Sequence, residues 1–307
     1  MFSAPNYHVK KILALVDVKA IRTRQFRVAL ETVNGGAIVT AKPLLTALGC
    51  TVAGLNIKTN GDFTHPPEPN PKNLAAFTGF IKKKRADIGF ALDPDGDRLV
   101  LVSPTHGVIS EECTLALVVR HFLTNITKGP VVINQSTSRM NEDIARENKC
   151  KLYRAPVGEV NVVTEMRKRG AIIGGEGNGG IIDPRLHHGR DGMAGIALIL
   201  DSMARANKTI DELVAALPRY SIVKDKVAVG ATDFKLITEK LIAEFADVKH
   251  TKNDGVRFAW ADRWLHVRTS NTEPIIRFIA EAPTTKESEA LIFRAKKSLA
   301  KLIKLAA

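Results

Sequence analysis

Short apolar runs alternate along the chain with longer amphipathic stretches, and this alternation predicts strands and helices in turn. After a helix in the opening residues, the predicted strands of the first part are 26–30, 51–55, 88–92 and 99–102, and its predicted helices are 41–48, 72–84 and 111–122. Strands that alternate with helices are typical of an α/β unit. The pattern therefore predicts one such unit.

A second set of elements follows the turn residues Lys128-Gly129-Pro130. Its predicted strands are 131–133, 151–155 and 171–173, and its predicted helices are 140–147, 159–169, 191–206 and 210–217. The alternation repeats that of the first set, so it predicts a second α/β unit that ends at Pro218.

The last third of the chain has a different order of elements. A β-rich stretch at 220–229 precedes a predicted helix at 234–245, strands at 256–260, 264–267 and 275–279, and an amphipathic helix at 286–303. Consecutive strands of this kind favour an antiparallel sheet. The sequence thus predicts two consecutive three-layer α/β domains with mixed sheets and a C-terminal α+β domain with an antiparallel sheet. The predicted bounds are 1–24 for a helical segment, 25–127 and 128–219 for the α/β domains, and 220–307 for the last domain.

The composition fits a globular chain, because 45% of its 307 residues are hydrophobic and can fill buried cores. No run approaches the roughly 20 apolar residues of a membrane span, and the N-terminus lacks a secretory pattern, so we expect a cytoplasmic protein with no membrane partner. Cys50, Cys113 and Cys150 form no C-x-x-C pair and predict neither a disulfide framework nor a zinc site.

A formal net charge of +13 makes nucleic acid a partner to consider. The basic residues are spread along the chain, however, and the local runs 82–85, 167–169 and 296–297 fall at predicted helix ends or on exposed helix faces. Aromatic residues, which would stack on bases, make up only 6% of the chain. We therefore expect no nucleic-acid partner, and an anionic small substrate accounts for part of the charge more economically.

Three carboxylates occupy alternate positions of the segment Asp93-Pro94-Asp95-Gly96-Asp97-Arg98, between two predicted strands. Such charges repel one another unless their oxygens coordinate a hard cation. An EF-hand loop begins in the same way, but it requires Gly and Glu at the positions where this chain has Arg98 and Pro104. The segment predicts a Mg²⁺ site at Asp93, Asp95 and Asp97, with a solvated turn as the alternative.

Five glycines surround Glu176 and Asn178 in the segment 174–180, directly after a predicted strand. Glycine permits positive φ and lets a ligand approach the backbone, while a carboxylate accepts hydrogen bonds from hydroxyl groups. The segment matches neither a dinucleotide fingerprint nor a P-loop. It predicts a sugar-binding loop centred on Glu176, with a flexible hairpin as the alternative.

Two arginines, Arg268 and Arg277, bracket a polar loop between a predicted strand and an apolar run. Guanidinium groups bind phosphate bidentately, and further donors come from Ser270, Asn271 and Thr272. The loop therefore predicts a phosphate-binding nest, and the alternative is a solvated hairpin with incidental arginines.

In this order, the three loops resemble the metal, sugar-binding and phosphate-binding loops of the α-D-phosphohexomutase superfamily, which includes phosphoglucosamine mutase, phosphomannomutase and phosphoglucomutase. The resemblance covers nearly the whole chain, and the segments 62–71, 156–162 and 174–180, the last followed by 188–191, look most like the first two of these enzymes. It implies an isomerase that moves a phosphoryl group within a glucosamine, mannose or glucose phosphate through a phosphoserine and a hexose 1,6-bisphosphate.

The resemblance also implies a role for individual residues of this chain. Asp93, Asp95 and Asp97 would hold one Mg²⁺ ion, and Arg98 would steady phosphate oxygens. Sugar hydroxyls would be oriented by Glu176, Gly177 and Asn178. The phosphate that does not react would be held by Arg268, Ser270, Asn271, Thr272 and Arg277.

The chain departs from the family pattern at the nucleophile. The family's Ser-His-Asn-Pro type of serine loop does not occur in the 307 residues, and we interpret 1–24 as a remnant of the linker into the family's second domain. Glu159 and Gly180 stand where many members have His, so no general acid or base is assigned. We expect a chain that binds Mg²⁺ and hexose phosphate but is inactive alone. The alternatives are a phosphosugar-binding or scaffold protein, and a partner for a separately encoded serine domain.

Overall fold

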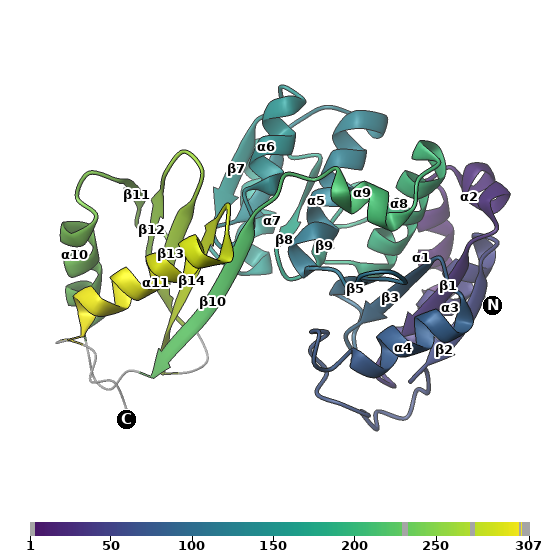
Figure 1. Cartoon of the computed structure of the whole chain (residues 1–307). Coiled ribbons are helices and arrows are strands. Elements are labelled where there is room, and N and C mark those ends of the chain that lie inside the picture. The colour runs from purple at the N-terminus through teal and green to yellow at the C-terminus, as the bar shows by residue number, and fades with distance from the viewer. Residues whose placement is uncertain (1–3, 229–232, 271–273, 301, 303–307) are drawn as a thin grey trace. The chain divides into compact units, whose positions relative to one another are not determined.

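The computed structural model describes residues 4–228, 233–270, 274–300 and 302 (Figure 1). The chain divides into two compact units, of which the first combines Met1–Asn134 with Asp143–Leu217 and the second combines Gln135–Glu142 with Pro218–Ala307. The first unit holds two mixed sheets and the second holds an antiparallel sheet. The predicted fold class is therefore confirmed, whereas the predicted domain bounds stay a prediction.

The first sheet has the strand order β2-β1-β3-β4-β5. Its strands are β1 (Arg27–Glu31), β2 (Thr51–Leu55), β3 (Ile88–Leu92), β4 (Leu99–Ser103) and β5 (Gly107–Val108). β1 pairs in parallel with β2 and β3, while β4 runs antiparallel to both β3 and β5. Every residue of β3 and β4 is buried, as expected for strands covered on both faces. The short β3–β4 connection carries the three aspartates.

Helices cover this sheet through their apolar residues. The helices are α3 (Ile38–Ala47), α4 (Ala75–Lys84) and α5 (Glu111–His121), and a π-helical turn (Phe122–Ile126) extends α5. Phe77 and Ile81 of α4 pack with Ala91 and Val100 in one core cluster. Phe77 and Ile81 are four residues apart and therefore lie on one face of α4, which explains why the sequence forms an amphipathic helix here.

The second sheet has the strand order β7-β6-β8-β9, with β6 (Val131–Asn134), β7 (Leu152–Ala155), β8 (Ile173–Glu176) and β9 (Gly180–Ile182). β6, β7 and β8 are parallel, and β9 returns antiparallel to β8. The helices that follow these strands are α6 (Met140–Glu147), α7 (Glu159–Arg169), α8 (Gly192–Ala206) and α9 (Ile210–Ala215). The glycine-rich segment is thus a tight β8–β9 hairpin, in which Glu176 pairs with Gly180.

The opening residues form two helices where the sequence pattern predicts one. They are α1 (Ala4–Leu13) and α2 (Val18–Arg24), and the side chain of Asp17 caps the second by accepting a hydrogen bond from the Ala20 N–H at 2.9 Å. Val9, Ile12 and Ile21 are buried, and the Asp17 N–H donates to Asp201 of α8 at 3.1 Å. Both helices are therefore packed parts of the first unit.

Among its described residues, the second unit has a five-stranded antiparallel sheet and two complete helices, besides the first residues of α6. The strand order is β10-β14-β13-β12-β11, and the elements are β10 (Ser221–Ala228), α10 (Phe234–Glu244), β11 (Lys249–Thr251), β12 (Val256–Ala259), β13 (Trp264–Thr269), β14 (Ile275–Ala282) and α11 (Thr285–Leu299). Figure 1 shows α11 lying along the sheet, and Ile292 and Leu299 of this helix share a core with Leu241 and Phe278. A capping box of Thr284 and Glu287 begins α11.

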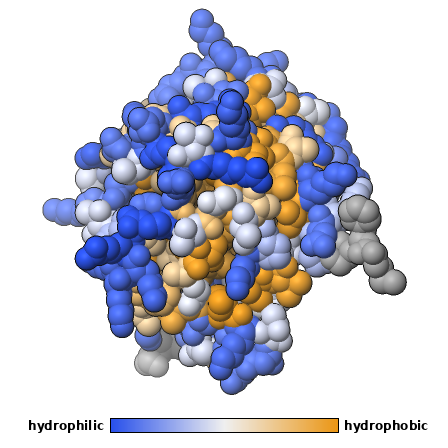
Figure 2. Space-filling model, turned by 90° about the vertical axis from the view of Figure 1, so that its right-hand side faces the viewer, coloured by the Kyte–Doolittle hydropathy of each residue, from blue (hydrophilic) through white to orange (hydrophobic). Residues whose placement is uncertain are grey.

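The surface turned toward the viewer in Figure 2 has both hydrophobic and hydrophilic residues. Hydrophobic residues gather over the middle of this face and hydrophilic ones surround them. In the first unit, large apolar side chains with considerable exposure include Tyr7, Val39 and Phe63. None of the helices that the structure describes combines the length and the apolar character that a bilayer span requires.

Candidate metal and sugar-phosphate site

The three carboxylates of the β3–β4 loop converge on one point. One oxygen each of Asp93, Asp95 and Asp97 lies within 4.8 Å of the other two. Oxygen ligands lie about 2.1 Å from a Mg²⁺ ion, so ligands on opposite sides of the ion are roughly 4.2 Å apart. The three oxygens need only a small adjustment to share one ion.

The backbone of the loop is held from two sides. The Ala37 N–H at the start of α3 donates to Pro94 O at 3.1 Å, and the Gly192 N–H at the start of α8 donates to Gly96 O at 2.9 Å. A Cβ at position 192 would meet Gly96 O at 2.6 Å, so glycine is required for this approach. The loop is thus fixed before any ligand binds.

The electrostatics of the loop favour a cation. Burial raises the pKa of Asp93 to about 7, and the charges of Asp97 and Asp95 add to this, while a hydrogen bond from the Arg98 N–H at 3.0 Å opposes it. The Arg98 Nε lies 3.6 Å from Asp93 Oδ2 and 3.8 Å from Asp97 Oδ1, too far for hydrogen bonds. Arg98 is thus a neighbour of these carboxylates without a side-chain hydrogen bond to them, and the all-oxygen donor set of the loop fits a hard divalent ion such as Mg²⁺.

Arg190 joins the carboxylate loop to the β8–β9 hairpin. Its Nη2 pairs with Asp97, its Nε donates to Glu159 Oε2 at 2.9 Å, and its Nη1 donates to Glu176 Oε2 at 3.2 Å. The sequence predicts no role for Arg190, although this residue lies in the segment 188–191 that supports the family resemblance. A single charged residue in a loop gives no sequence signal of which carboxylates it will reach.

Glu176 is buried and held by three donors. Besides the bond from Arg190, its Oε1 accepts hydrogen bonds from Asn134 Nδ2 at 2.8 Å and from the Gly158 N–H at 3.0 Å. Its carboxylate is therefore fixed in one orientation, and a sugar hydroxyl would have to share Oε2 with Arg190. The sugar-binding role predicted for Glu176 stays a prediction.

The rest of the hairpin is equally close-packed. Gly177 lies against the carboxylate of Glu112, Asn178 Oδ1 accepts from the Gly180 N–H at 3.2 Å, and the Leu99 N–H donates to Gly179 O at 3.1 Å. The last bond ties the hairpin to the strand that follows the carboxylate loop. Both loops of the first unit therefore belong to one connected region.

A pocket of 240 Å³ opens beside this region. Its lining residues include Asp95, Asp97 and Arg190, together with Thr40 of α3 and Met193 of α8. Carboxylates and a guanidinium group thus face a common space in the first unit, as a site for a metal ion and an anionic ligand requires.

The predicted phosphate-binding loop lies in the second unit. Arg268 and Arg277 are paired across β13 and β14, and Arg277 Nη2 donates to Ser270 Oγ at 3.4 Å. Arg268 is buried, and its Nε donates to Asp254 Oδ1 at 3.0 Å. The predicted donors Asn271 and Thr272 lie outside the described residues. Arg277 is the more exposed of the two arginines and is the better placed to meet a ligand from solvent.

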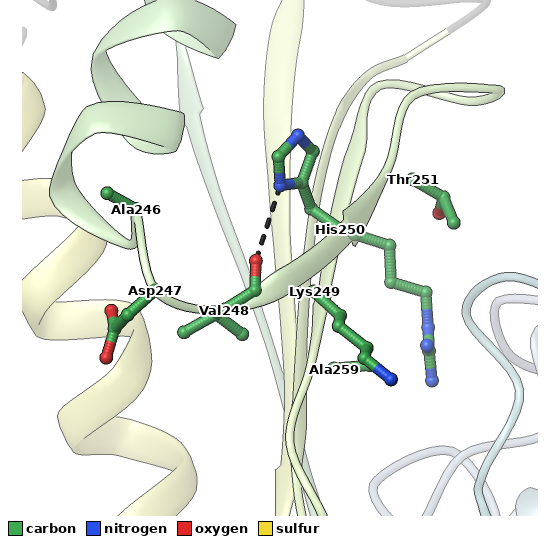
Figure 3. Close-up of a pocket in the computed structure, with 8 residues that line it drawn as sticks. Ala246, Asp247, Val248, Lys249, His250, Thr251 and Ala259 are labelled. Atoms are coloured by element: carbon green, nitrogen blue, oxygen red, sulfur yellow. Dashed lines mark hydrogen bonds between the residues drawn. The ribbon is translucent and has the colours of Figure 1, made fainter.

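A second hollow, of 600 Å³, lies at the edge strand β11 (Figure 3). It is lined by Ala246, Asp247, Val248, Lys249, His250, Thr251, Arg257 and Ala259. His250 Nδ1 lies 3.3 Å from Val248 O. Asp247 is the one carboxylate among these lining residues, so the hollow does not offer the ligand set of a magnesium site.

Three family models match consecutive parts of the chain. "Phosphoglucomutase/phosphomannomutase, alpha/beta/alpha domain II" matches 6–107, "alpha/beta/alpha domain III" matches 111–220, and the C-terminal domain of the same family matches 223–295. Together with the three sheets of the fold, these matches identify domains II, III and IV of one protein family. The chain belongs to the α-D-phosphohexomutase superfamily.

Curated relatives cover most of this chain. A "Phosphoglucomutase/phosphomannomutase" of Thermococcus kodakarensis is 37% identical over 92% of this chain and 62% of its own length. A "Probable phosphoglucosamine mutase" of Methanopyrus kandleri is 31% identical over 94% of this chain and 64% of its own length. The chain thus spans less than two thirds of the length of these relatives.

Solved structures share the fold. The crystal structure of a phosphoglucomutase/phosphomannomutase family protein from Burkholderia thailandensis matches with a TM-score of 0.84 at 24% identity, over 98% of this chain and 65% of its own. N-acetylphosphoglucosamine mutase of Aspergillus fumigatus, solved in complex with GlcNAc-6P and magnesium, matches with a TM-score of 0.67 at 15% identity, over 96% of this chain and 65% of its own. At these identities the two structures are evidence for the fold alone.

Proposed function

We propose that the chain provides the metal-, sugar- and phosphate-binding parts of a phosphohexomutase, an isomerase that interconverts hexose 6-phosphates and hexose 1-phosphates in the cytoplasm. The observation that carries the proposal is the convergence of Asp93, Asp95 and Asp97 in a loop that Arg190 connects to the β8–β9 hairpin. The names of the relatives and the family of the chain support it.

Asp93, Asp95 and Asp97 hold one Mg²⁺ ion in this proposal. The bound ion would offset the negative charge that develops on the transferred phosphoryl group, which is the main help that phosphoryl transfer needs. Arg98, whose Nε lies near Asp93 and Asp97, steadies the phosphate oxygens beside them. The magnesium in the Aspergillus fumigatus mutase supports the choice of ion.

The β8–β9 hairpin and the second unit each have a binding role in this proposal. Glu176, Gly177 and Asn178 orient the sugar hydroxyls, while Arg268, Ser270, Asn271, Thr272 and Arg277 hold the phosphate that does not react. The sugar is a glucose, mannose or glucosamine phosphate, as the names of the relatives suggest.

The phosphoryl group is carried by a serine that lies outside these 307 residues. We therefore expect no turnover when the 307-residue chain is incubated with glucose 1-phosphate, glucose 1,6-bisphosphate and Mg²⁺ in an assay coupled to the appearance of glucose 6-phosphate. A serine-bearing domain from one of the relatives, added in trans, should restore turnover. Turnover by the chain alone would refute the assignment of the nucleophile.

A test of binding separates the mutase proposal from an unrelated use of the fold. Calorimetry with glucose 1,6-bisphosphate and Mg²⁺ should show binding that weakens when Arg277 is replaced by Gln. Lys224→Gln, which removes a cation from β10 of the same unit, is the matched control and should leave binding unchanged. If the bisphosphate does not bind, the proposed function is wrong whatever the source of the nucleophile.

A further inference from the structure

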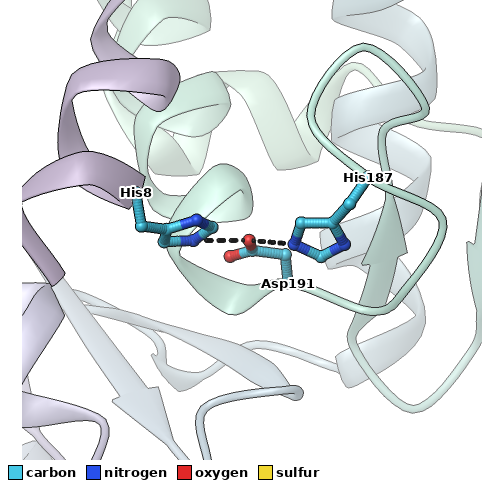
Figure 4. A group of neighbouring side chains, drawn as sticks. All are labelled: His8, His187 and Asp191. Carbon is cyan, nitrogen blue, oxygen red and sulfur yellow. Dashed lines mark hydrogen bonds and ion pairs between the residues drawn. The ribbon is translucent and has the colours of Figure 1, made fainter. Parts of the chain in front are cut away.

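Three side chains of types that can bind a metal ion meet between α1 and the loop that leads into α8 (Figure 4). His8 of α1 directs Nε2 at Asp191 Oδ2 over 2.8 Å, and His187 of the loop directs its Nε2 at the same oxygen over 3.0 Å. The three ligand atoms lie within 4.8 Å of one another. The two imidazole rings are stacked, with their centroids 5.8 Å apart.

The carboxylate of this cluster is fixed before anything binds. Asp191 Oδ1 accepts a hydrogen bond from the Ala194 N–H at 2.9 Å as the N-cap of α8, and the Asp191 N–H donates to Ile181 O at 2.8 Å. Oδ2 is therefore the oxygen that faces the two imidazoles. A metal ion in their midst would have one carboxylate oxygen and two imidazole nitrogens as ligands.

Solvent reaches the two histidines but hardly the aspartate. The side chains of His8 and His187 are 28% and 43% exposed, whereas that of Asp191 is 6% exposed. A metal ion held by the three groups would consequently keep a coordination position open to water. Three protein ligands and one water are the pattern of an accessible tetrahedral zinc site.

The surrounding charges favour a cation. His8 and Asp191 line the same pocket as Asp95, Asp97 and Arg190. Arg190 already pairs with three carboxylates, so its positive charge is more than neutralised. Among the residues that line this pocket, the carboxylates of Asp95, Asp97 and Asp191 therefore outnumber the one arginine.

We propose that His8, His187 and Asp191 form a binding site for a divalent transition-metal ion, for which Zn²⁺ is the probe. Imidazole nitrogen suits zinc and its neighbours in the first transition row, whereas Mg²⁺ prefers oxygen ligands such as those of the β3–β4 loop. The site thus differs from the magnesium site in both metal and ligands, and it does not depend on the proposed mutase function. Because His8 lies in α1 and the other two ligands lie in and after the loop that leads into α8, the bound ion would stabilise the packing of α1 against that loop.

The test is a calorimetric titration of the full chain with Zn²⁺, after removal of any affinity tag and with Mg²⁺ in excess. We expect one Zn²⁺ ion to bind with a Kd below about 10 µM, and His8→Gln and His187→Gln each to weaken binding by about tenfold or more. His188→Gln, which changes the adjacent exposed histidine, and Asp95→Asn, which changes the magnesium loop, should bind Zn²⁺ within about threefold of the wild type.

A second readout guards against variants that fail to fold. Zn²⁺ should raise the Tm of the wild-type chain and of His188→Gln but not that of His8→Gln, because binding to the folded state alone stabilises it. The proposal is overturned if the wild type shows no Zn²⁺ binding, or if the His8 and His187 variants bind like the wild type. It is also overturned if Asp95→Asn abolishes binding, since the zinc would then occupy the carboxylate loop.

Discussion

Arg190 Nη1 lies 3.2 Å from Glu176 Oε2, and the same guanidinium group pairs with Asp97 of the β3–β4 loop. The side chain of Arg190 is 15% exposed, so this bridge is largely withdrawn from solvent. A cation that contacts a proposed metal ligand competes with the metal for that ligand. It also fixes the hairpin to which the proposed sugar-binding residues belong.

We predict that Arg190→Gln tightens Mg²⁺ binding while it destabilises the fold. Removal of one positive charge next to Asp97 should improve Mg²⁺ affinity by about fivefold, which corresponds to roughly 1 kcal/mol in a partly solvated site. The Tm should fall, because the buried carboxylate of Glu176 loses a charged partner. Calorimetry with Mg²⁺ and thermal unfolding measure the two effects, and weaker Mg²⁺ binding would contradict the competition between Arg190 and the metal.

Asp95 offers the most direct test of the magnesium site, because it is exposed and its substitution leaves the core untouched. We predict that Asp95→Asn weakens Mg²⁺ binding by about tenfold or more with little change in Tm, since one of the three proposed anionic ligands is lost. Asp247→Asn, an exposed aspartate of the second unit, is the matched control and should bind Mg²⁺ normally. Equal affinities of the two variants would mean that the ion is bound elsewhere.

Most of the fold could be predicted from the sequence, because most of its strands are either continuous apolar runs or regular alternations of apolar and polar residues. β3 and β4 are buried at every position, and α6 and α7 occupy the predicted residues 140–147 and 159–169. β9 and β11 were missed for physical reasons. The first begins inside the glycine-rich segment, and the three residues of β11 are all exposed and polar or charged, so neither shows a hydrophobic pattern.

The candidate site was only partly predictable. The spacing of Asp93, Asp95 and Asp97 identifies the loop, because residues so close in sequence must be close in space. The partners of Arg190 lie 14 to 93 residues away along the chain. Such contacts depend on how α8 and the two sheets pack, and no local pattern encodes them. The pairing of Arg268 with Asp254 was missed for the same reason.

We predict that the contact between Asp201 and the N-terminal helices weakens in acid. Burial alone would raise its pKa, but hydrogen bonds from His121, Arg205 and the Asp17 N–H outweigh burial and lower the pKa. A carboxyl group whose pKa is lowered on folding stabilises the folded state above its unfolded pKa of about 3.9, and this contribution is lost as the pH falls below that value.

The variant that tests this is Asp201→Asn. At pH 7 it should be less stable than the wild type by about 3 kcal/mol, because His121 and Arg205 lose their charged partner. The difference should shrink as the pH is lowered below 4, because the unfolded wild-type chain then takes up a proton at Asp201 before the folded chain does. Urea unfolding followed by circular dichroism measures both, and Asp211→Asn on α9 is the matched control. A difference that stays constant with pH would contradict the assignment.

In the second unit, His266 makes stability depend on pH for a different reason. Its imidazole is buried and neutral, so protonation is unfavourable in the folded state. Burial lowers its pKa from 6.5 to about 4; its Nε2–H donates to Asp254 O, and its Nδ1 accepts from the Ser136 hydroxyl at 2.9 Å. The folded state is favoured fully above pH 6.5, and this contribution is lost as the pH falls from 6.5 toward 4, because the unfolded chain takes up the proton first.

The free energy of unfolding should fall by an amount on the order of 3 kcal/mol, and this change can be followed in the second unit alone. Both tryptophans of the chain, Trp260 and Trp264, belong to that unit, so tryptophan fluorescence during urea unfolding reports its stability. We expect the stability to fall between pH 6.5 and pH 4 in the wild type and in His250→Gln, which alters an exposed histidine. In His266→Gln, which cannot titrate, the dependence on pH over this range should be nearly absent. A wild-type slope that persists in His266→Gln would show that other groups cause the acid sensitivity.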